Sequence, residues 1–259
     1  MKILIPSRSR ARNLVTPYEI PKKHRHMVRV YVAQEQYDEY VRHNPNLDIR
    51  TCSDMNDLLG QKLYLMAKDT TDDEHVMMCD DDFRWFTRIE EDAPQLRKLE
   101  EDEFQDMFAE VMCQFTNPNI YGVGISMRQG NNRLEPEGGT NTRLNGCVTY
   151  NRELFLSCEH DRVNPMNDFD VNLQLLRRGY DNHLVSQYCY NQVGGTNAPG
   201  GSSDYRTQET QSAAAERLAE LHPGFVRTRL KVNKSGPENL RERKEVTVYW
   251  KKARASACS

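Results

Sequence analysis

The sequence lacks the features that would place it in or across a membrane. None of its 259 residues falls in a window that approaches the roughly 18 consecutive apolar residues of a membrane span. The apolar run at 3–5 stops at Pro6 and turns basic at Arg8, so the N-terminus does not have the pattern of a secretory signal peptide. We therefore expect no membrane partner.

Cysteine is sparse and shows no pairing pattern. Seven cysteines are scattered through the chain, and no two of them form a C-x-x-C pair. This pattern argues against a disulfide framework and against a cysteine-based zinc site. Reduced thiols are typical of the cytoplasm, which is the predicted location.

Several catalytic signatures are also missing. There is no G-x-x-x-x-G-K-[ST] sequence, so a P-loop is excluded, and no G-x-S-x-G elbow of a serine hydrolase. The adjacent His160 and Asp161 lack the H-x-[DE] spacing of an iron- and 2-oxoglutarate-dependent oxygenase. Any phosphate binding must therefore use other elements.

Charge is unevenly distributed along a chain whose formal net charge is only -3. Residues 8–29 contain seven Lys or Arg and one acid, and residues 227–254 contain ten bases and three acids. Between them, residues 69–110 contain sixteen acids and four bases. Basic ends suit phosphate-bearing ligands, including nucleotides and nucleic acid, whereas much of the acidic middle is expected to be solvated helix surface.

Strand-like and helix-like segments alternate through the first half of the chain. Strands are predicted at 2–6, 27–33, 48–52, 75–79 and 120–126, and helices at 35–43, 58–66 and 100–115. This order predicts an α/β fold with a mixed, mostly parallel sheet and helices on both faces. Later segments are predicted as strands at 147–150 and 183–190, helices at 169–178 and 207–221, and two basic edge strands at 228–232 and 246–250.

The sharpest chemical signal is the run of three aspartates at 80–82. A buried strand delivers Asp80, Asp81 and Asp82 to its carboxyl end, where open α/β sheets bind ligands. Neighbouring carboxylates repel one another unless a cation lies between them, and Mg²⁺ or Mn²⁺ would also bridge to nucleotide phosphates. Because side chains alternate along an extended chain, Asp80 and Asp82 are the predicted metal pair. The alternative is a solvated acidic loop.

A second signal is the sequence Ile-Leu-Ile-Pro-Ser-Arg-Ser-Arg at 3–10. A first strand leads directly into hydroxyl and guanidinium groups, which are suited to a phosphate or a base because Arg donates in a planar fork. The predicted donor-binding residues of this segment are Pro6, Ser7, Arg8 and Arg10. A basic surface turn is the alternative.

These features together resemble the GT-A family of nucleotide-sugar glycosyltransferases, which carry a first-strand donor loop and a D-x-D motif after the fourth strand. The resemblance implies a GT-A-like (Rossmann-like) catalytic domain over 1–205, with a C-terminal helix and basic tail at 206–259 packed on it. It also implies that Asp54 contacts the nucleotide base, that Lys62 approaches the ribose and phosphates, and that Asp80 and Asp81 bind the donor. In Asn167-Asp168-Phe169-Asp170, it implies that Asp168 or Asp170 is the catalytic base of an inverting enzyme.

Many members of that family complete the metal site with a later histidine. His222, just before Pro223-Gly224, is the preferred third ligand here, with His183 and Asn191 as alternatives. Lys231 and Lys234 are expected to neutralise the departing diphosphate. The glycine-rich segment 194–203 is expected to be a lid over the donor or a plain connection.

Within the GT-A proteins, the Ile-Pro-Ser-x-x-Arg opening and the basic tail resemble phage DNA glycosyltransferases associated with TET-type dioxygenases. This resemblance implies transfer from a UDP-sugar to a hydroxymethylated pyrimidine in DNA, in the host cytoplasm for a phage-encoded protein. Lys251, Lys252 and Arg254 are the predicted DNA-binding residues, beside Tyr249 and Trp250, which would suit base stacking. A basic edge strand that discourages aggregation is the alternative interpretation.

Two other functions remain open at this point. A nucleotidyltransferase would share the α/β fold and an acidic metal site, although it usually has a glycine-rich basic loop after the first strand, and residues 7–12 contain no glycine. A nucleic-acid-binding protein without catalysis would account for the basic ends but not for the aspartates at a strand end.

Overall fold

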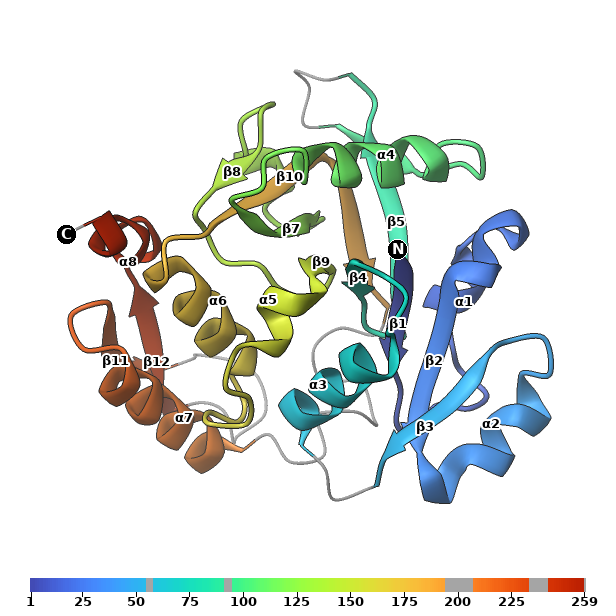
Figure 1. Ribbon diagram of the computed structural model, residues 1–259, viewed down its shortest axis with the longest axis horizontal. Coiled ribbons are helices and arrows are strands. Elements are labelled where there is room, and N and C mark those ends of the chain that lie inside the picture. Colours follow the sequence, from blue (N-terminus) through green and yellow to red (C-terminus); the bar gives the residue numbers. More distant parts are fainter. Residues whose placement is uncertain (55–57, 91–94, 194–206, 233–241, 259) are drawn as a thin grey trace.

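A single mixed sheet forms the centre of the molecule (Figure 1). The computed structural model describes residues 1–54, 58–90, 95–193, 207–232 and 242–258. Within these ranges the sheet has ten strands in the order β3-β2-β1-β4-β9-β7-β10-β5-β6, with β8 paired to β10.

The N-terminal half of the sheet is parallel. Its strands are β1 (Lys2–Pro6), β2 (Val28–Ala33), β3 (Ile49–Ser53) and β4 (His75–Met78). Ile3 is in register with Val28 on one side and with Met77 on the other. Most side chains of β1, β2 and β4 are buried, as is typical of parallel strands covered on both faces.

The other half of the sheet mixes directions. It contains β5 (Phe83–Arg88), β6 (Leu96–Lys98), β7 (Ile120–Met127), β8 (Gly139–Thr140), β9 (Val148–Asn151) and β10 (Asp181–Gln192). Only β5, β8 and β9 run against the remaining seven strands. The predicted mixed, mostly parallel sheet is confirmed.

Helices cover both faces of the sheet and enclose a separate core on each. Ile3 and Ile5 point into one core with residues of α2 (Tyr37–His43) and α4 (Phe104–Gln114) and with Leu14 and Ile20, which flank α1 (Thr16–Glu19). Leu4 points into the other core, beneath α3 (Leu59–Asp69), α5 (Arg152–Leu156) and α6 (Asn167–Arg177). Because side chains alternate in direction along β1, this one strand contributes to the cores under both layers of helices. Short 3-10 helices lie at Lys22–Met27, Gln34–Gln36, Asn131–Arg133 and Ser256–Cys258.

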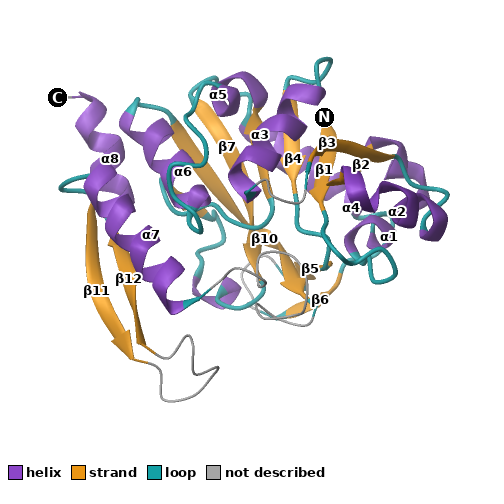
Figure 2. Cartoon of the chain, turned by 90° about the horizontal axis from the view of Figure 1, so that it is seen from below, coloured by secondary structure: helices purple, strands orange, loops and turns teal. Residues whose placement is uncertain are grey.

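The C-terminal segment packs against α6. It consists of α7 (Gln208–Leu221), β11 (Val226–Val232), β12 (Glu242–Val248) and α8 (Trp250–Ala255). Leu218, Val226 and Ala253 are buried in the same core as Leu173 of α6. Figures 1 and 2 show this segment at the end of the molecule opposite β3.

The prediction of two edge strands in the basic tail is wrong in two respects. β11 and β12 pair with each other in a separate two-stranded sheet and do not extend the central one. The second strand ends at Val248, and Trp250 begins a helix.

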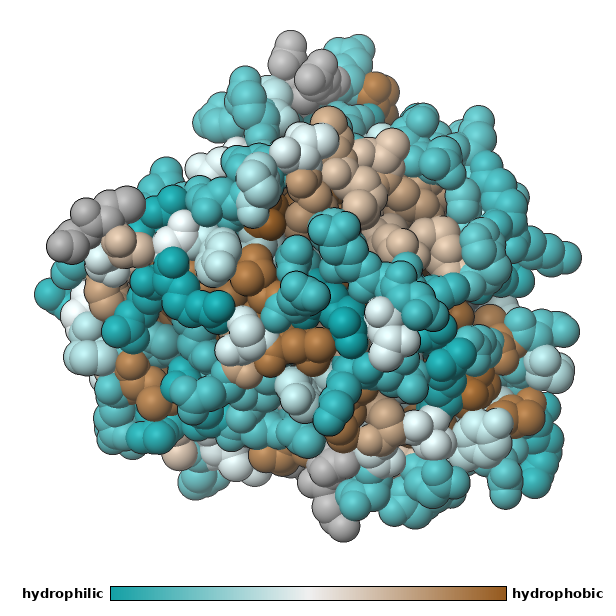
Figure 3. Space-filling model, viewed as in Figure 1, coloured by the Kyte–Doolittle hydropathy of each residue, from teal (hydrophilic) through white to brown (hydrophobic). Residues whose placement is uncertain are grey.

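The exterior is mostly polar. The face in Figure 3 is largely covered by hydrophilic residues. Across the described residues, none of the helices combines the length and the apolar character that crossing a bilayer requires.

Candidate active site

The aspartate triplet lies in a turn that is fixed through its backbone. β4 ends at Met78, and the Asp81 carbonyl then accepts from the amides of Val15 and Thr16, at 2.9 and 3.0 Å. The Thr16 hydroxyl donates to the Asp80 carbonyl at 2.6 Å, and the Val193 amide donates to the Asp82 carbonyl at 2.8 Å. Three carboxylates thus extend from a turn held by the start of α1 and the end of β10.

Asp81 joins this turn to the loop after β1. Its buried carboxylate accepts from the Ser7 hydroxyl and from Arg10 Nη1, the latter at 2.6 Å. Tyr40 closes the arrangement, because its hydroxyl lies 2.7 Å from the Ser7 hydroxyl and accepts from the Arg10 amide at 2.9 Å. The side chain of Asp81 therefore orders the predicted donor loop.

Asp80 and Asp82 carry negative charge that their surroundings only partly balance. Burial first, and then the charges of Asp82 and Asp81, raise the pKa of Asp80 to about 7. Burial and the charge of Asp81 raise the pKa of Asp82 to about 6, although Arg10 opposes the shift. Asp82 Oδ2 accepts from Arg10 Nη1 at 3.1 Å and from Gln192 Nε2 at 3.3 Å, whereas the buried Oδ1 has no hydrogen-bond partner in the described structure.

This donor set fits a hard divalent cation. Carboxylate oxygens are the ligands that Mg²⁺ and Mn²⁺ prefer, and the unpartnered oxygen of Asp82 is the kind of atom that such an ion satisfies. Within the described ranges, no three His, Cys, Asp or Glu side chains converge as a complete metal site. The remaining ligands would have to come from substrate phosphates and water, as is common for Mg²⁺.

The other predicted donor residues lie around the first loop. Pro6 ends β1, and Arg8 is partly buried with no partner for its Nε in the described structure. Lys62 is buried on α3 and donates to the Ser7 carbonyl at 3.0 Å, so it belongs to the same loop. Asp54 is exposed just after β3.

The two candidate bases on α6 differ sharply in their surroundings. Asp168 is partly exposed, and its Oδ2 accepts from Arg143 Nη2 at 2.8 Å and Nε at 3.1 Å. Its charge is close enough to raise the pKa of Asp80. Asp170 is buried, and Arg162 donates to both of its oxygens, at 2.7 and 3.0 Å. Of the two carboxylates, Asp168 is therefore the one that is partly exposed and whose charge acts on the triplet.

His222 lies with Asp170 and not with the triplet. Its Nε2 is 2.7 Å from Asp170 Oδ1, and its Nδ1 is 3.1 Å from Arg177 Nη1. Because both ring nitrogens are engaged in a buried network, this arrangement does not support the predicted role of His222 as a metal ligand. Lys231 is paired with Glu245 on the β11–β12 hairpin, at 2.8 Å, and Lys234 lies outside the described residues, as does the predicted lid at 194–203.

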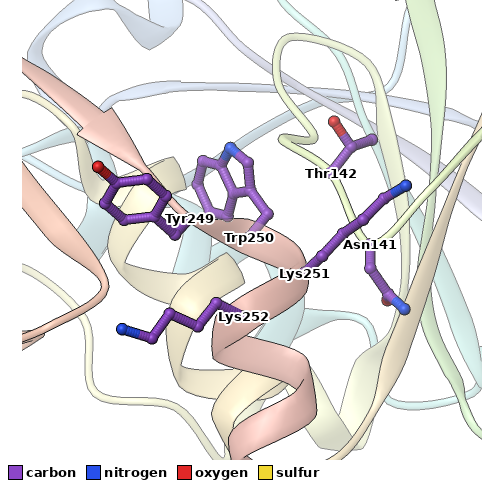
Figure 4. Close-up of a pocket in the computed structure, with 6 residues that line it drawn as sticks. All are labelled: Asn141, Thr142, Tyr249, Trp250, Lys251 and Lys252. Atoms are coloured by element: carbon purple, nitrogen blue, oxygen red, sulfur yellow. The ribbon is translucent and has the colours of Figure 1, made fainter.

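The predicted DNA-binding residues lie on α8, and they differ in whether their charged groups already have a partner within the protein. The Arg254 guanidinium forms an ion pair with Asp181, at 2.7 Å. Lys252 donates to the Gly224 carbonyl at 3.2 Å, whereas Lys251 is exposed. Figure 4 shows Lys251 beside a pocket of about 320 Å³, lined by Asn141, Thr142, Tyr249, Trp250, Lys251 and Lys252.

The surroundings of Tyr190 were not predicted from the sequence; burial first, and then the charge of Asp80, raise the pKa of Tyr190 well above its usual value. Tyr190 stacks on Phe83 with ring centroids 4.1 Å apart and donates to the Asn145 carbonyl at 3.1 Å. Gly146 has φ +70, and a Cβ there would lie 2.1 Å from the Tyr190 hydroxyl. The close approach requires glycine, and the available signal was the Asn145-Gly146 pair before the strand at 147–150.

Comparison with known proteins agrees with this geometry. Residues 1–201 match the family described as TET-associated glycosyltransferase. The chain belongs to this family. The matched region contains the triplet, the loop after β1, Asp168 and Arg143, whereas α7, β11, β12 and α8 lie beyond it.

Comparison with solved structures shows a similarity of fold. A mannosyltransferase from Pyrobaculum calidifontis, in complex with GDP-Man and Mn²⁺, is similar with a TM-score of 0.58 and 14% identity over 93% of this chain. The match spans 66% of that structure, just under two thirds of its length. A structure described as a glucose-1-phosphate thymidylyltransferase from Bacillus anthracis is less similar, with a TM-score of 0.45 and 12% identity, covering 91% of this chain and 98% of that one. A search of curated protein sequences gave no significant match.

Proposed function

We propose that this glycosyltransferase moves a sugar from a nucleoside-diphosphate donor, a UDP-sugar by expectation, to the hydroxyl of a hydroxymethylated pyrimidine in DNA. One observation carries the proposal. Asp80 and Asp82 lie at the carboxyl end of β4 with a partly unbalanced charge, within electrostatic reach of Asp168. Family membership and the basic C-terminal segment support the choice of donor and acceptor.

Asp80 and Asp82 would hold the divalent cation, which supplies charge neutralisation for the leaving diphosphate when bound. The Mn²⁺ and GDP-Man in the similar mannosyltransferase support this choice of cofactor. Ser7, Arg8 and Lys62 surround the same loop, where amide, hydroxyl and cationic groups can orient the phosphates. Asp81 holds that loop in place through Ser7 and Arg10.

Asp168 is the proposed base. As the acceptor hydroxyl oxygen attacks the anomeric carbon, the bond from that carbon to the diphosphate oxygen breaks and the hydroxyl proton passes to Asp168. Arg143 holds one oxygen of Asp168, and the other oxygen would accept the proton. A single displacement of this kind inverts the anomeric configuration, and a general base typically contributes about 10²–10⁴-fold.

The decisive experiment incubates the protein and Mn²⁺ with nucleotide sugars and duplex DNA containing 5-hydroxymethylpyrimidines. The expected result is a DNA nucleoside heavier by one sugar, with release of the nucleoside diphosphate. Release of pyrophosphate would instead indicate a nucleotidyltransferase. Transfer to a protein or a small molecule, with none to DNA, would overturn the acceptor and leave the sugar transfer standing.

A further inference from the structure

The hairpin formed by β11 and β12 has two chemically distinct faces. In their antiparallel register, Val226, Thr228 and Leu230 lie opposite Val248, Val246 and Lys244. The residues between them, Arg227, Arg229 and Lys231, lie opposite Thr247, Glu245 and Arg243. Because side chains alternate along a strand, these two sets point to opposite sides of the hairpin.

The first set faces the body of the protein at its Val226 and Val248 end and along β12, whereas Leu230 on the same side is 61% exposed. Val226 is buried, and Val246 and Val248 pack against the core that contains Leu218 of α7. Lys244 on the same side contacts α7 twice, through its amide to the Ser212 hydroxyl and through its ammonium to Glu216. The second set therefore faces outward, and Figure 2 shows the hairpin projecting beside α7.

The outward set is strongly basic. It consists of Arg227, Arg229, Lys231, Arg243, Glu245 and Thr247, with four cationic side chains and one carboxylate, a net charge of +3. We call it the basic ribbon face. Arg229 and Lys231 have exposed side-chain fractions of 66% and 42%. Lys231 and Arg243 each lie 2.8 Å from Glu245. One carboxylate thus pairs with more than one cation, and the net charge of the face stays positive.

Two of the three cations of α8 are engaged within the protein, whereas Lys251 is exposed. Arg254 is paired with Asp181, and Lys252 bonds to a backbone carbonyl. The ribbon face therefore carries four cations, against three on α8, of which two are engaged within the protein. The sequence alone could not show which of these cations face outward.

The ribbon face is connected to the acceptor side of the active site. β12 leads into α8 through Tyr249, over which the Arg227 guanidinium lies 5.5 Å from the ring centroid. Trp250 follows and packs against Phe169, next to Asp168. The end of the ribbon at Val226 and Val248 is therefore joined by α8 to the element that carries the proposed base.

We propose that the basic ribbon face is the docking surface for the duplex DNA acceptor, an inference that rests on the proposed function. Guanidinium and ammonium groups on a two-stranded ribbon suit phosphates, and the major groove of B-DNA is wide enough to admit such a ribbon. The C5 position of a pyrimidine is displayed in that same groove. Docking in the major groove would place the hydroxymethyl group of the pyrimidine on the side of the duplex that faces the protein.

The test compares two triple variants of the full chain in DNA binding across a salt series. The ribbon variant is Arg227→Gln, Arg229→Gln and Arg243→Gln. The matched control is Lys22→Gln, Lys23→Gln and Lys68→Gln, which removes the same charge from exposed positions on other elements. Each lost phosphate contact should lower the slope of log affinity against log salt by about 0.9, so the ribbon variant should lose up to about 2.7.

The expected result is a weaker and less salt-dependent complex for the ribbon variant alone, by at least about tenfold in affinity at low salt. Donor hydrolysis in the absence of DNA should stay unchanged in both variants, which shows that the fold and donor site are intact. Equal DNA affinity of the two variants, with normal transfer to DNA by the unaltered chain, would overturn the ribbon assignment only. Absence of any transfer to DNA by the unaltered chain would overturn the proposed acceptor itself.

Discussion

Trp250 packs against Phe169 with ring centroids 5.7 Å apart and planes inclined by 32°. The same Phe169 ring lies 4.0 Å from the guanidinium carbon of Arg143, and Arg143 forms the ion pair with Asp168. The aromatic pair thus links α8, which lies beyond the family-matched region, to the proposed base. The C-terminal helix supports the active site as well as the fold.

Replacing Trp250 with Ala should lower kcat by about tenfold or more, because a small displacement of a catalytic group is costly. The KM for the nucleotide sugar should change little, since the donor loop is on another element. Trp250→Phe keeps an aromatic contact and should restore most of kcat. Steady-state kinetics of both variants, with circular dichroism as a folding control, checks this; equal losses in both would assign Trp250 a general structural role.

Asp168→Asn should reduce the single-turnover rate by about 10²–10⁴-fold, because the amide cannot accept the hydroxyl proton. Donor affinity, measured by calorimetry with Mn²⁺, and thermal stability should remain close to those of the unaltered protein. Product with retained anomeric configuration, observed by NMR, would contradict the assignment of Asp168 as base.

Asp170→Asn should act on stability instead. Burial raises the pKa of Asp170, but hydrogen bonds from His222 and Arg162 outweigh it and leave the pKa below its usual value. The ionised carboxylate therefore stabilises the fold above the unfolded pKa of about 4, and this contribution is lost as the pH falls through the folded value. Removing one partner of a buried ion pair costs about 3–5 kcal/mol.

Urea unfolding at several pH values checks this prediction for Asp170. The unaltered protein should lose stability below about pH 4, and the Asn variant should be less stable at neutral pH with a flatter acid dependence. A variant as stable as the unaltered protein, but catalytically inactive, would exchange the roles assigned to Asp168 and Asp170.

Asp80→Asn should abolish transfer and Mn²⁺-dependent donor binding while the fold stays intact. It also removes one of three mutually repelling carboxylates, so the metal-free variant should melt at a higher temperature than the unaltered protein. Relief of roughly 1 kcal/mol corresponds to about 2–4 °C for a chain of this size. Calorimetry without metal and a transfer assay with Mn²⁺ are the two measurements, and normal turnover would remove the triplet from the active site.

Local pattern was enough to predict the strands that position the triplet. Apolar runs at 2–6 and 75–79 correspond to β1 and β4, since buried parallel strands leave a direct hydrophobic signal. The hairpin of β5 and β6 was missed. Arg84 and Arg88 make that segment look polar, yet Arg88 is buried and donates to the carbonyls of Asn131 and Leu134. Because these hydrogen-bond partners of Arg88 are 43 or more positions away in sequence, the residues around Arg88 give no sign that it is buried.

The same limit applies to the candidate site. Spacing along one strand placed Asp80, Asp81 and Asp82 together, but it could not show that Asp81 bonds Ser7 while Asp82 keeps an unpartnered oxygen. His222 was chosen from its position before the basic tail. Its partner Asp170 is 52 positions away in sequence, and only the packing of α6 against the end of α7 brings them together.

Arg10 pairs with both Asp81 and Asp82, so its positive charge enters the net charge of the group formed by Arg10 and the three aspartates, here called the donor floor. Three ionised carboxylates and one guanidinium sum to two negative charges, which a single divalent ion neutralises. Without the ion, burial and the neighbouring carboxylates raise the pKa of Asp80 to about 7 and that of Asp82 to about 6, and a bound divalent ion would make the floor electroneutral. We therefore expect the metal to bind before the donor or together with it, with one ion per chain.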